Sequence, residues 1–359
     1  MDFLFIKGDR PHDVRMAKYI RRLSAIGHKV SFWGWDRLSK GETMKGLVEC
    51  RYLYKGGGFR NRVWLRYPIW MFRLFFAMLF SRQLKGKEII AENFDSAFPV
   101  CIACWIRGLA FSYEILDEFA ISYKFPTFVK WLLTKIDHWI IRKAKLIIHV
   151  DSNRITYASE KSVVIENSPE DYWEGKQRSY QNMARKFAVV GCLSAGRGLF
   201  SICDFAARNP NVSVLIVGNL CDDKVKQRVS ELSNAQCYDF MPQGELFKLM
   251  ESCCGVFSLY EPTLEINRLA ASNKVYDAMM MGIPVITNKE VINSRFIEDQ
   301  GVGIVVDYNC NETWDQLVAE DYLSRAVSIG RKGRRLYLDE YQFDVMLAKR
   351  FIPAIEARR

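Results

Sequence analysis

Residues 272–288 of this chain read Ser-Asn-Lys-Val-Tyr-Asp-Ala-Met-Met-Met-Gly-Ile-Pro-Val-Ile-Thr-Asn. The stretch predicts a helix that runs into a strand. Ser272 or Asn273 can cap the helix, because their side-chain oxygens accept unpaired backbone N–H groups at its start. Gly282 can adopt the left-handed conformation that ends a helix. Pro284 is followed by a β-branched run that is typical of a buried parallel strand.

The start of this helix is suited to binding an anion. A helix N-terminus offers free N–H groups and about half a positive charge, which favours a diphosphate. Lys274 adds a full charge there, and Asp277, one turn further on, carries a carboxylate that can hold the two hydroxyls of a ribose. The alternative is a capped amphipathic helix whose Lys and Asp side chains are merely solvated, which is also common.

The stretch resembles the donor-site motif of family-4-type retaining glycosyltransferases, which have the GT-B fold. The matching residues are Asn273-Lys274-x-x-Asp277-Ala278-Met279-x-x-Gly282-x-Pro284-Val285-Ile286. The resemblance implies that the helix start binds the diphosphate of a nucleotide sugar. It also implies that Asp277, in place of the family's commoner Glu, binds the ribose. The family has a further Glu upstream, where this chain has Leu269; Glu265 is the nearest upstream acid, and its role is open.

Charge is distributed unevenly along the 359 residues. Residues 1–168 hold 28 of the 51 Lys and Arg residues but 16 of the 41 Asp and Glu residues, whereas the remainder is close to neutral. The length suits two domains of ordinary size. The basic first half predicts an anionic partner, for which nucleic acid, an anionic bilayer surface and a phosphorylated acceptor are the candidates.

The ten cysteines predict free thiols rather than a disulfide scaffold. Cys101-x-x-Cys104 lies in an apolar run without a second such pair or a nearby His, so we predict buried thiols there rather than a metal or redox site. The sequence contains no run of about 20 uncharged apolar residues, so we predict no membrane-spanning helix. We therefore expect a cytoplasmic protein, with peripheral contact to the inner face of the cytoplasmic membrane as an open alternative.

The first half opens with the pattern of a βαβ unit. Apolar runs at 3–6 and 29–33 flank a helical pattern at 14–26, with Asp13 as its candidate cap. Residues 36–61 are polar and glycine-rich, with a loop predicted at Gly56-Gly57-Gly58. No Gly-x-Gly-x-x-Gly follows the first strand, which argues against a nicotinamide or flavin enzyme.

Residues 60–87 alternate arginines with bulky aromatic side chains. A basic helix rich in Trp, Tyr and Phe is typical of a segment at a membrane interface, where rings lie at the headgroup level and cations contact anionic lipid. The alternative is an ordinary amphipathic helix that packs on the sheet with its arginines in solvent. The resemblance favours membrane contact, because many members of the family glycosylate lipid-linked acceptors.

Asp117 and Glu118 follow a predicted strand at 111–116. Ligands of parallel α/β sheets gather beyond the carboxyl ends of strands, so both acids are placed for the acceptor side of a cleft. The segment resembles the family's Tyr-(Glu/Asp)-x-x-Asp or His-Glu segment, whose Asp or His lies near the transferred sugar. We assign Asp117 a positioning role; the alternative is a helix N-cap.

The second half begins with an apolar strand at 187–191, after a polar stretch at 170–185 that is the best candidate linker. Gly191 lets the backbone approach a ligand closely, and Arg197 can meet a phosphate with a forked pair of donors. The family's pattern here is Gly-x-Leu, then a basic residue and Gly-Leu, and its basic residue binds the donor diphosphate. A plain surface turn is the alternative.

The resemblance implies an α/β fold of GT-B architecture, with two Rossmann-like parallel-sheet domains and a cleft between them. We expect an acceptor-binding domain at 1–168 and a donor-binding domain at 169–340. By analogy with the family, a C-terminal helix at 341–359 crosses back to the first domain.

The leading hypothesis is a retaining, metal-independent glycosyltransferase that moves a sugar from a nucleotide sugar to an acceptor hydroxyl. The expected acceptor is a lipid-linked saccharide in cell-surface polysaccharide or lipopolysaccharide assembly. The main catalytic task of such an enzyme is to stabilise the departing diphosphate, and we assign this task to Arg197, Lys274 and the helix dipole. No Asp-x-Asp occurs in the chain, and neither a metal nor another cofactor is expected.

Two other functions stay open. A GT-B nucleotide-sugar 2-epimerase needs additional acid and base residues, and the four histidines show no supporting cluster. A basic membrane-surface binding module with a decayed donor site is favoured by Asp277 in place of Glu and by Leu269 at the position of the missing acid. Nucleic acid is not expected as a partner, since no recognised binding motif accompanies the basic, aromatic stretch.

Overall fold

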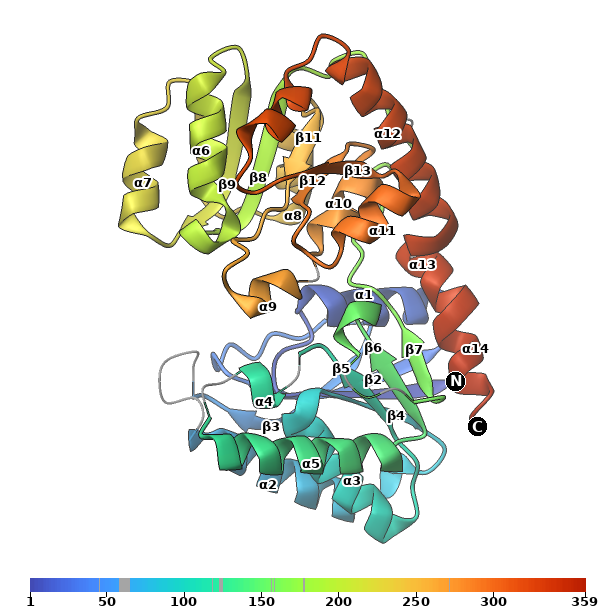
Figure 1. Ribbon diagram of the computed structural model, residues 1–359. Coiled ribbons are helices and arrows are strands. Elements are labelled where there is room, and N and C mark those ends of the chain that lie inside the picture. The colour runs from blue at the N-terminus through green and yellow to red at the C-terminus, as the bar shows by residue number, and fades with distance from the viewer. Residues whose placement is uncertain are drawn as a thin grey trace. The chain divides into compact units, whose positions relative to one another are not determined.

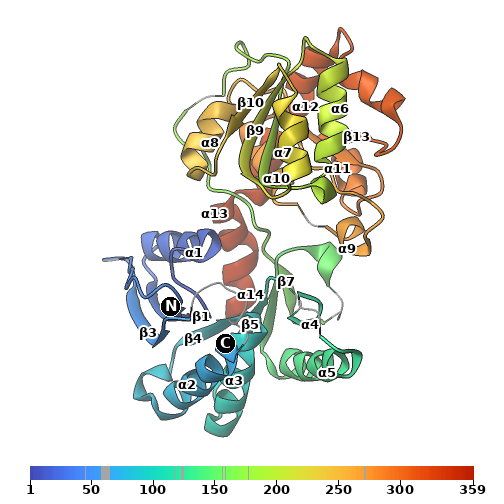
Figure 2. The ribbon, with the colours of Figure 1, turned by 90° about the vertical axis from the view of Figure 1, so that its left-hand side faces the viewer.

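The structure is a computed structural model that describes residues 1–44, 46–57, 65–117, 119–122, 125–155, 157, 159–176, 178–270 and 272–359. The chain divides into two compact units. Unit 1 comprises Met1–Glu166 together with Leu347–Arg359, and unit 2 comprises Asn167–Met346. Each unit is a twisted sheet flanked by helices (Figures 1 and 2). The acceptor-binding and donor-binding roles assigned to the two halves stay predictions.

Unit 1 is built on a parallel sheet with the strand order β3-β2-β1-β4-β5-β6-β7 among its described residues. The order reverses between β1 and β4, which are paired side by side. Its strands are β1 (Asp2–Lys7), β2 (Lys29–Asp36), β3 (Glu49–Lys55), β4 (Glu88–Glu92), β5 (Ser112–Ile115), β6 (Leu146–His149) and β7 (Ser162–Val164). The edge strand β3 lies inside the stretch 36–61, whose polar, glycine-rich sequence predicted no strand.

Helices cover both faces of this sheet, because successive side chains of its strands point to opposite sides. Leu4 and Ile6 pack into a core with α2 and α3, whereas the Phe3 ring lies 5.9 Å from Phe351 on the other face. Figure 1 shows α2, α3 and α5 on one face and α1 on the other. The bounds are α1 (Val14–Ala25), α2 (Tyr67–Phe80), η2 (Arg82–Leu84), α3 (Asn93–Arg107), α4 (Phe119–Ser122), α5 (Thr127–Lys143), η3 (Ser152–Arg154), η7 (Leu347–Phe351) and α14 (Ile352–Glu356).

The predicted state of the first cysteine pair is confirmed. Cys101 and Cys104 are free thiols on α3, and each is 1% exposed. Burial raises the pKa of Cys101 to about 11 and that of Cys104 to about 12. These thiols are therefore core side chains, and both stay protonated near neutral pH.

Unit 2 has a second parallel sheet, with the order β10-β9-β8-β11-β12-β13 in the described part of the chain. This is the doubly wound order in which two halves meet at the first and fourth strands, here β8 and β11. The strands are β8 (Lys186–Leu193), β9 (Ser213–Leu220), β10 (Ala235–Tyr238), β11 (Gly255–Phe257), β12 (Val285–Asn288) and β13 (Gly303–Val306).

The helices of unit 2 again form two layers around the sheet. Phe187 and Val189 pack with α6 on one face, and Ala188 packs with α8 and α10 on the other. The elements are η4 (Ala195–Arg197), α6 (Leu199–Arg208), α7 (Asp223–Ser230), α8 (Gln243–Met250), α9 (Glu265–Arg268), α10 (Lys274–Met281), α11 (Ser294–Gln300), η5 (Asn311–Leu317), α12 (Tyr322–Leu336), η6 (Tyr337–Tyr341) and α13 (Phe343–Met346). The helix and strand predicted for 272–288 are thus confirmed as α10 and β12.

Candidate functional site

The candidate site of unit 2 lies at the carboxyl edge of its sheet, where the strand order reverses between β8 and β11. Ligands of doubly wound sheets bind at such a reversal. Arg197, Tyr260 and Lys274 line one small pocket there. Its volume of about 10 Å³ has room for about one water molecule. The structure therefore brings together two of the predicted residues, Arg197 and Lys274, which are far apart in the sequence.

Gly191, between two residues that line this pocket, lies beside the Lys274 side chain. Gly191 has φ +109, a backbone conformation that residues other than glycine rarely adopt. A Cβ atom on Gly191 would lie 3.7 Å from the Lys274 Nζ atom. That distance is an ordinary van der Waals contact, whereas a Cβ atom on Gly218 of β9 would overlap the Gly191 carbonyl oxygen, at 2.0 Å. The paired glycines thus leave a bare stretch of backbone beside the Lys274 ammonium.

The N-terminus of α10 is held by Ser272, which is buried. Its hydroxyl accepts a hydrogen bond from the Lys274 N–H at 3.3 Å and shares another with the Ser258 hydroxyl at 2.7 Å. Asn273 is exposed, and its side chain makes no capping bond. Of the two candidates, Ser272 is therefore the residue whose side chain caps α10. Asp277 lies in the first turn of α10 and is partly buried.

Three residues that the sequence analysis did not single out position the Arg197 loop. The Arg197 guanidinium stacks on the Tyr260 ring, with 4.5 Å between Cζ and the ring centroid. Asn288, at the end of β12, accepts from the Tyr260 N–H at 3.0 Å and donates to its carbonyl at 3.1 Å. The Asn267 amide donates to the carbonyls of Gly196 and Glu261. The sequence signal for two of them was their position in apolar runs: Tyr260 ends the run that contains β11, and Asn288 is the last residue of β12.

Glu265 and Leu269 lie on or directly after the short helix α9, and both are exposed. Neither lines the pocket that contains Arg197 and Lys274. The structure therefore gives Glu265 no contact with this pocket.

In unit 1, Asp117 is exposed and follows the carboxyl end of β5. Glu118 lies outside the described residues. The segment before Asp117 is tied to the start of α3, because the Asn93 side-chain oxygen accepts a hydrogen bond from the Leu116 N–H at 3.2 Å. Asn93 itself has φ +60, an uncommon conformation for a residue with a side chain.

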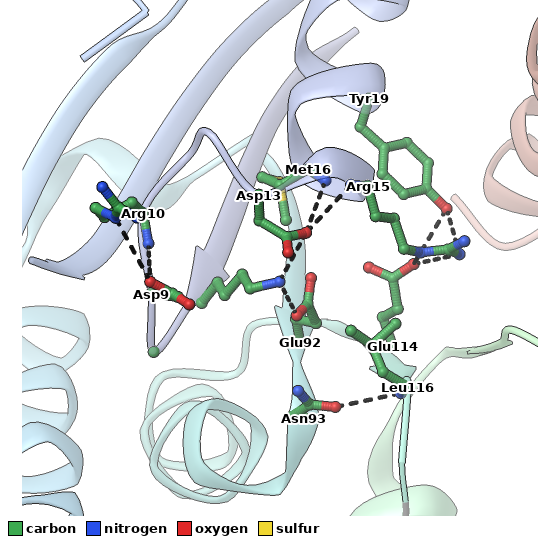
Figure 3. Close-up of polar contacts among 12 residues, drawn as sticks. Asp9, Arg10, Asp13, Arg15, Met16, Tyr19, Glu92, Asn93, Glu114 and Leu116 are labelled. Carbon is green, nitrogen blue, oxygen red and sulfur yellow. Dashed lines mark hydrogen bonds and ion pairs between the residues drawn. The ribbon is translucent and has the colours of Figure 1, made fainter. Parts of the chain in front are cut away.

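A buried network of charged residues lies beneath this edge of the unit 1 sheet (Figure 3). Lys7 at the end of β1 pairs with Glu92 at 2.5 Å and with Asp13 at 3.1 Å. Arg15 donates to one oxygen of Glu114 at 2.7 and 2.9 Å. Burial raises the pKa of the Glu92 carboxyl, although the Lys7 charge opposes it. The network joins the carboxyl ends of β1, β4 and β5 to the start of α1, and so fixes the edge that carries Asp117.

No family model matches this sequence, and no curated protein matches it either. Several solved structures are similar to this chain in three dimensions. The HepE protein of Anabaena, determined in complex with UDP, is 15% identical, with a TM-score of 0.68 over 99% of this chain and 100% of that one. The lipopolysaccharide outer core galactosyltransferase WaaB is 14% identical, with a TM-score of 0.66 over 100% of both chains. A sucrose-phosphate synthase from Thermosynechococcus elongatus is 11% identical, with a TM-score of 0.69 over 100% of both chains.

Proposed function

Because this chain has the GT-B fold, as the sequence predicted, we propose that it is a glycosyltransferase that uses a nucleotide-sugar donor. Unit 2 would bind the donor, and unit 1 would bind the acceptor whose hydroxyl receives the sugar. HepE, one of the similar structures, has been determined with UDP and with UDP-glucose, and WaaB is a galactosyltransferase.

The observation that carries the proposal is the meeting of two cations and a helix N-terminus at the strand reversal of unit 2. Arg197 and Lys274 line the same pocket, and Lys274 is the first residue of α10. Such an arrangement suits a diphosphate, because the backbone N–H groups and the dipole at a helix N-terminus favour negative charge. The pocket has room for only about one water molecule, so the diphosphate would lie over its mouth, between the two side chains.

These groups would also supply the catalysis. Glycosyl transfer requires departure of a nucleoside diphosphate while an oxocarbenium-like sugar forms. Preorganised donors that meet the developing charge on the leaving group stabilise that transition state. Arg197, Lys274 and the dipole of α10 would do this, and the proposal calls for neither a metal nor another cofactor.

The nucleoside would lie along the same sheet edge. Asp277, on the first turn of α10, would accept hydrogen bonds from the ribose hydroxyls, and Gly191 would allow the close approach of the ribose or the phosphates. A second pocket, of about 340 Å³, opens at the carboxyl ends of β9 and β10 and suits the base. Its lining includes Gly218, Asn219, Tyr238 and Asp239.

For the acceptor side we propose Asp117 as a positioning residue beyond the end of β5. We also propose transfer with retention of the anomeric configuration, and a lipid-linked saccharide of a surface polysaccharide as the acceptor; both rest on the sequence resemblance. The anomeric signal of the product in a proton spectrum tests retention. Product identity also separates transfer from 2-epimerisation, which would convert the nucleotide sugar without any acceptor.

The first experiment is thermal unfolding of the purified protein with UDP, GDP, ADP and dTDP. A ligand at 100 times its dissociation constant stabilises the folded state by about 2.7 kcal/mol. We expect one nucleotide to raise the melting temperature, and Lys274→Ala and Asp277→Ala to reduce that rise. Lys224→Ala is the matched control, since Lys224 is an exposed lysine on α7. If no nucleotide shifts the folded protein, the binding-module hypothesis replaces the transferase.

A membrane-binding surface on unit 1 is a second proposal, which the exposure of α2 favours. Phe72 and Phe80 of α2 are 64% and 72% exposed, and Phe128 and Trp131 of α5 are 71% and 56% exposed. Figure 1 shows both helices on the same face of the sheet. Of the predicted segment 60–87, residues 60–64 lie outside the described residues. No helix that the structure describes is long and apolar enough to span a membrane.

The arginines of the predicted segment are not the best positions at which to test this surface. Arg73 donates to the Leu53 carbonyl at 3.2 Å and stacks on the Tyr54 ring, and Arg66 donates to the Tyr54 hydroxyl, so these arginines also have structural roles. The exposed rings give the cleaner test. We expect Phe72→Gln with Phe80→Gln to lower binding to vesicles that contain phosphatidylglycerol, while the nucleotide-induced thermal shift stays. Unchanged vesicle binding would contradict the proposal.

A further inference from the structure

Two exposed cysteines lie side by side on neighbouring strands of unit 2. Cys192 is the penultimate residue of β8, and Cys221 directly follows β9. The Cys221 N–H donates to the Leu193 carbonyl at 2.9 Å, which extends the pairing of β8 and β9 to the two cysteines. Their Sγ atoms lie 3.2 Å apart and share a hydrogen bond.

This thiol pair lies at the edge that carries the candidate donor site. Cys192 lines the same pocket as Arg197 and Lys274. Asn219 and Leu220, which precede Cys221, line the pocket at the ends of β9 and β10. A molecule that occupied both pockets would therefore pass over or beside the two sulfur atoms.

We propose that Cys192 and Cys221 form an oxidisable dithiol, which a low-molecular-weight disulfide converts to an intramolecular disulfide beside the donor pocket. The thiolate of one cysteine attacks the small disulfide, forms a mixed disulfide and releases one small thiol. The second cysteine then attacks the mixed disulfide, the bond between Cys192 and Cys221 forms, and the second small thiol leaves. The pair loses two protons and two electrons, and the oxidant gains them.

The second part of the inference, which rests on the proposed function, is that a bound nucleotide protects the pair. A disulfide bond has a length of about 2.05 Å, so the two sulfur atoms must approach by about 1 Å. A nucleotide that covers the carboxyl ends of β8 and β9 hinders both this movement and access of the oxidant. Oxidation and nucleotide binding should therefore oppose each other.

The test uses the full chain and oxidised glutathione, followed by blocking of free thiols and peptide mass mapping without reduction. We expect a peptide pair linked through Cys192 and Cys221, and a higher rate toward alkaline pH, because the shared hydrogen bond raises the pKa of Cys221. In Cys192→Ser and Cys221→Ser the link must vanish, and the remaining cysteine should carry glutathione. Cys237→Ser removes another exposed thiol and should keep the link. Glutathione on Cys192 and Cys221 separately in the unaltered chain, or no reaction at either, would overturn the dithiol.

A parallel series measures the rate of link formation with saturating UDP, GDP, ADP or dTDP. We expect the nucleotide that raises the melting temperature to slow the link at least fivefold, and the linked protein to lose most of that thermal shift. If a nucleotide stabilises the protein but leaves the rate unchanged, the protection is wrong while the donor site stands. If the link forms and no nucleotide stabilises the reduced protein, the proposed function fails and the dithiol stands.

Discussion

The side-chain amide of Asn288 forms hydrogen bonds with both the backbone N–H and the backbone carbonyl of Tyr260, as a neighbouring strand would. Its oxygen accepts from the Tyr260 N–H at 3.0 Å, and its nitrogen donates to the Tyr260 carbonyl at 3.1 Å. Asn288 is fully buried, and Tyr260 is 4% exposed. The ring that supports Arg197 is thus held in place by a side chain from the next strand, β12.

Asn288→Ala should therefore weaken both the fold and the site. The substitution leaves a buried N–H and a buried carbonyl without their partner, which costs about 2–4 kcal/mol of unfolding free energy in total. Because Tyr260 supports Arg197, we also expect a smaller thermal shift by the binding nucleotide. Asn309→Ala, at an exposed position of the same unit, is the control. An Asn288→Ala protein of unchanged stability would show that the pairing contributes nothing.

Gly198 is expected to tolerate no side chain. It has φ +72, and a Cβ atom there would lie 2.6 Å from the Leu259 Cβ atom. Gly198→Ala combines the cost of a left-handed alanine, about 1–2 kcal/mol, with this steric overlap. We expect a lower melting temperature and a displaced Arg197. Gly244→Ala is the matched control, because its Cβ atom would meet nothing within 4 Å, and it should be neutral or stabilising. Equal melting temperatures of the two variants would refute the argument.

The parts of the fold that the sequence predicted are those with local signals. The α10–β12 unit is an example, because Ser272 caps the start of α10 and the left-handed Gly282, with φ +67, ends it. Both effects depend only on residues nearby in the sequence. The strand β3 was missed because it is an edge strand whose polar side chains face outward. Tyr54 is buried, whereas Arg51, Lys55 and Glu49 are exposed, so only half of the strand carries an apolar signal.

The parts that the sequence could not predict depend on contacts between distant residues. Arg15 and Glu114 are separated by 99 positions, and each alone has the appearance of a solvated charge in its own segment. The stacking of Arg197 on Tyr260 is a second case, because only the parallel pairing of β8 with β11 brings the two loops together. Arg197 and Lys274 themselves were predicted from their charge and from the family resemblance, whose motif spacing carries such long-range information, and their roles in binding stay predictions.

The ion pair of Asp171 and Arg334 anchors the start of unit 2 to α12. Its two bonds measure 2.7 and 2.8 Å, and Arg334 also donates to the Met280 carbonyl at 3.1 Å. Arg334→Met leaves the buried Asp171 carboxylate without its cation and with the Trp173 N–H as a remaining donor, which should cost about 3 kcal/mol. Adding Asp171→Asn should restore part of this loss. Additive losses in the double variant would show that the two residues do not act as a pair.

The stability of unit 1 should depend on the protonation of Asp95. This residue of α3 is buried beside Gly8 and Trp70, since a Cβ atom on Gly8 would lie 2.3 Å from an Asp95 carboxylate oxygen and 3.3 Å from the Trp70 indole nitrogen. Burial is the main cause that raises the pKa of Asp95 to about 6, although the nearby Arg37 charge opposes it. The folded state therefore holds its proton to a higher pH than the unfolded chain does.

The sign of the resulting pH dependence follows from this difference. Between the ordinary pKa of an Asp side chain, about 4, and the folded value of about 6, the folded state binds more protons than the unfolded state. The contribution of Asp95 to the unfolding free energy therefore falls as the pH rises through this window, by about 2 kcal/mol between about pH 4.5 and 7.5. Asp95→Asn should remove this dependence.

The measurement is urea unfolding of the unaltered protein and of Asp95→Asn across that pH range. The variant should gain about 2 kcal/mol relative to the unaltered protein as the pH rises, whatever constant cost the amide brings. Taking the difference between the two proteins cancels the titration of all other groups that they share. A difference that stays constant with pH would show that Asp95 holds no extra proton in the folded state. A difference of the opposite sign would mean that Arg37 outweighs burial.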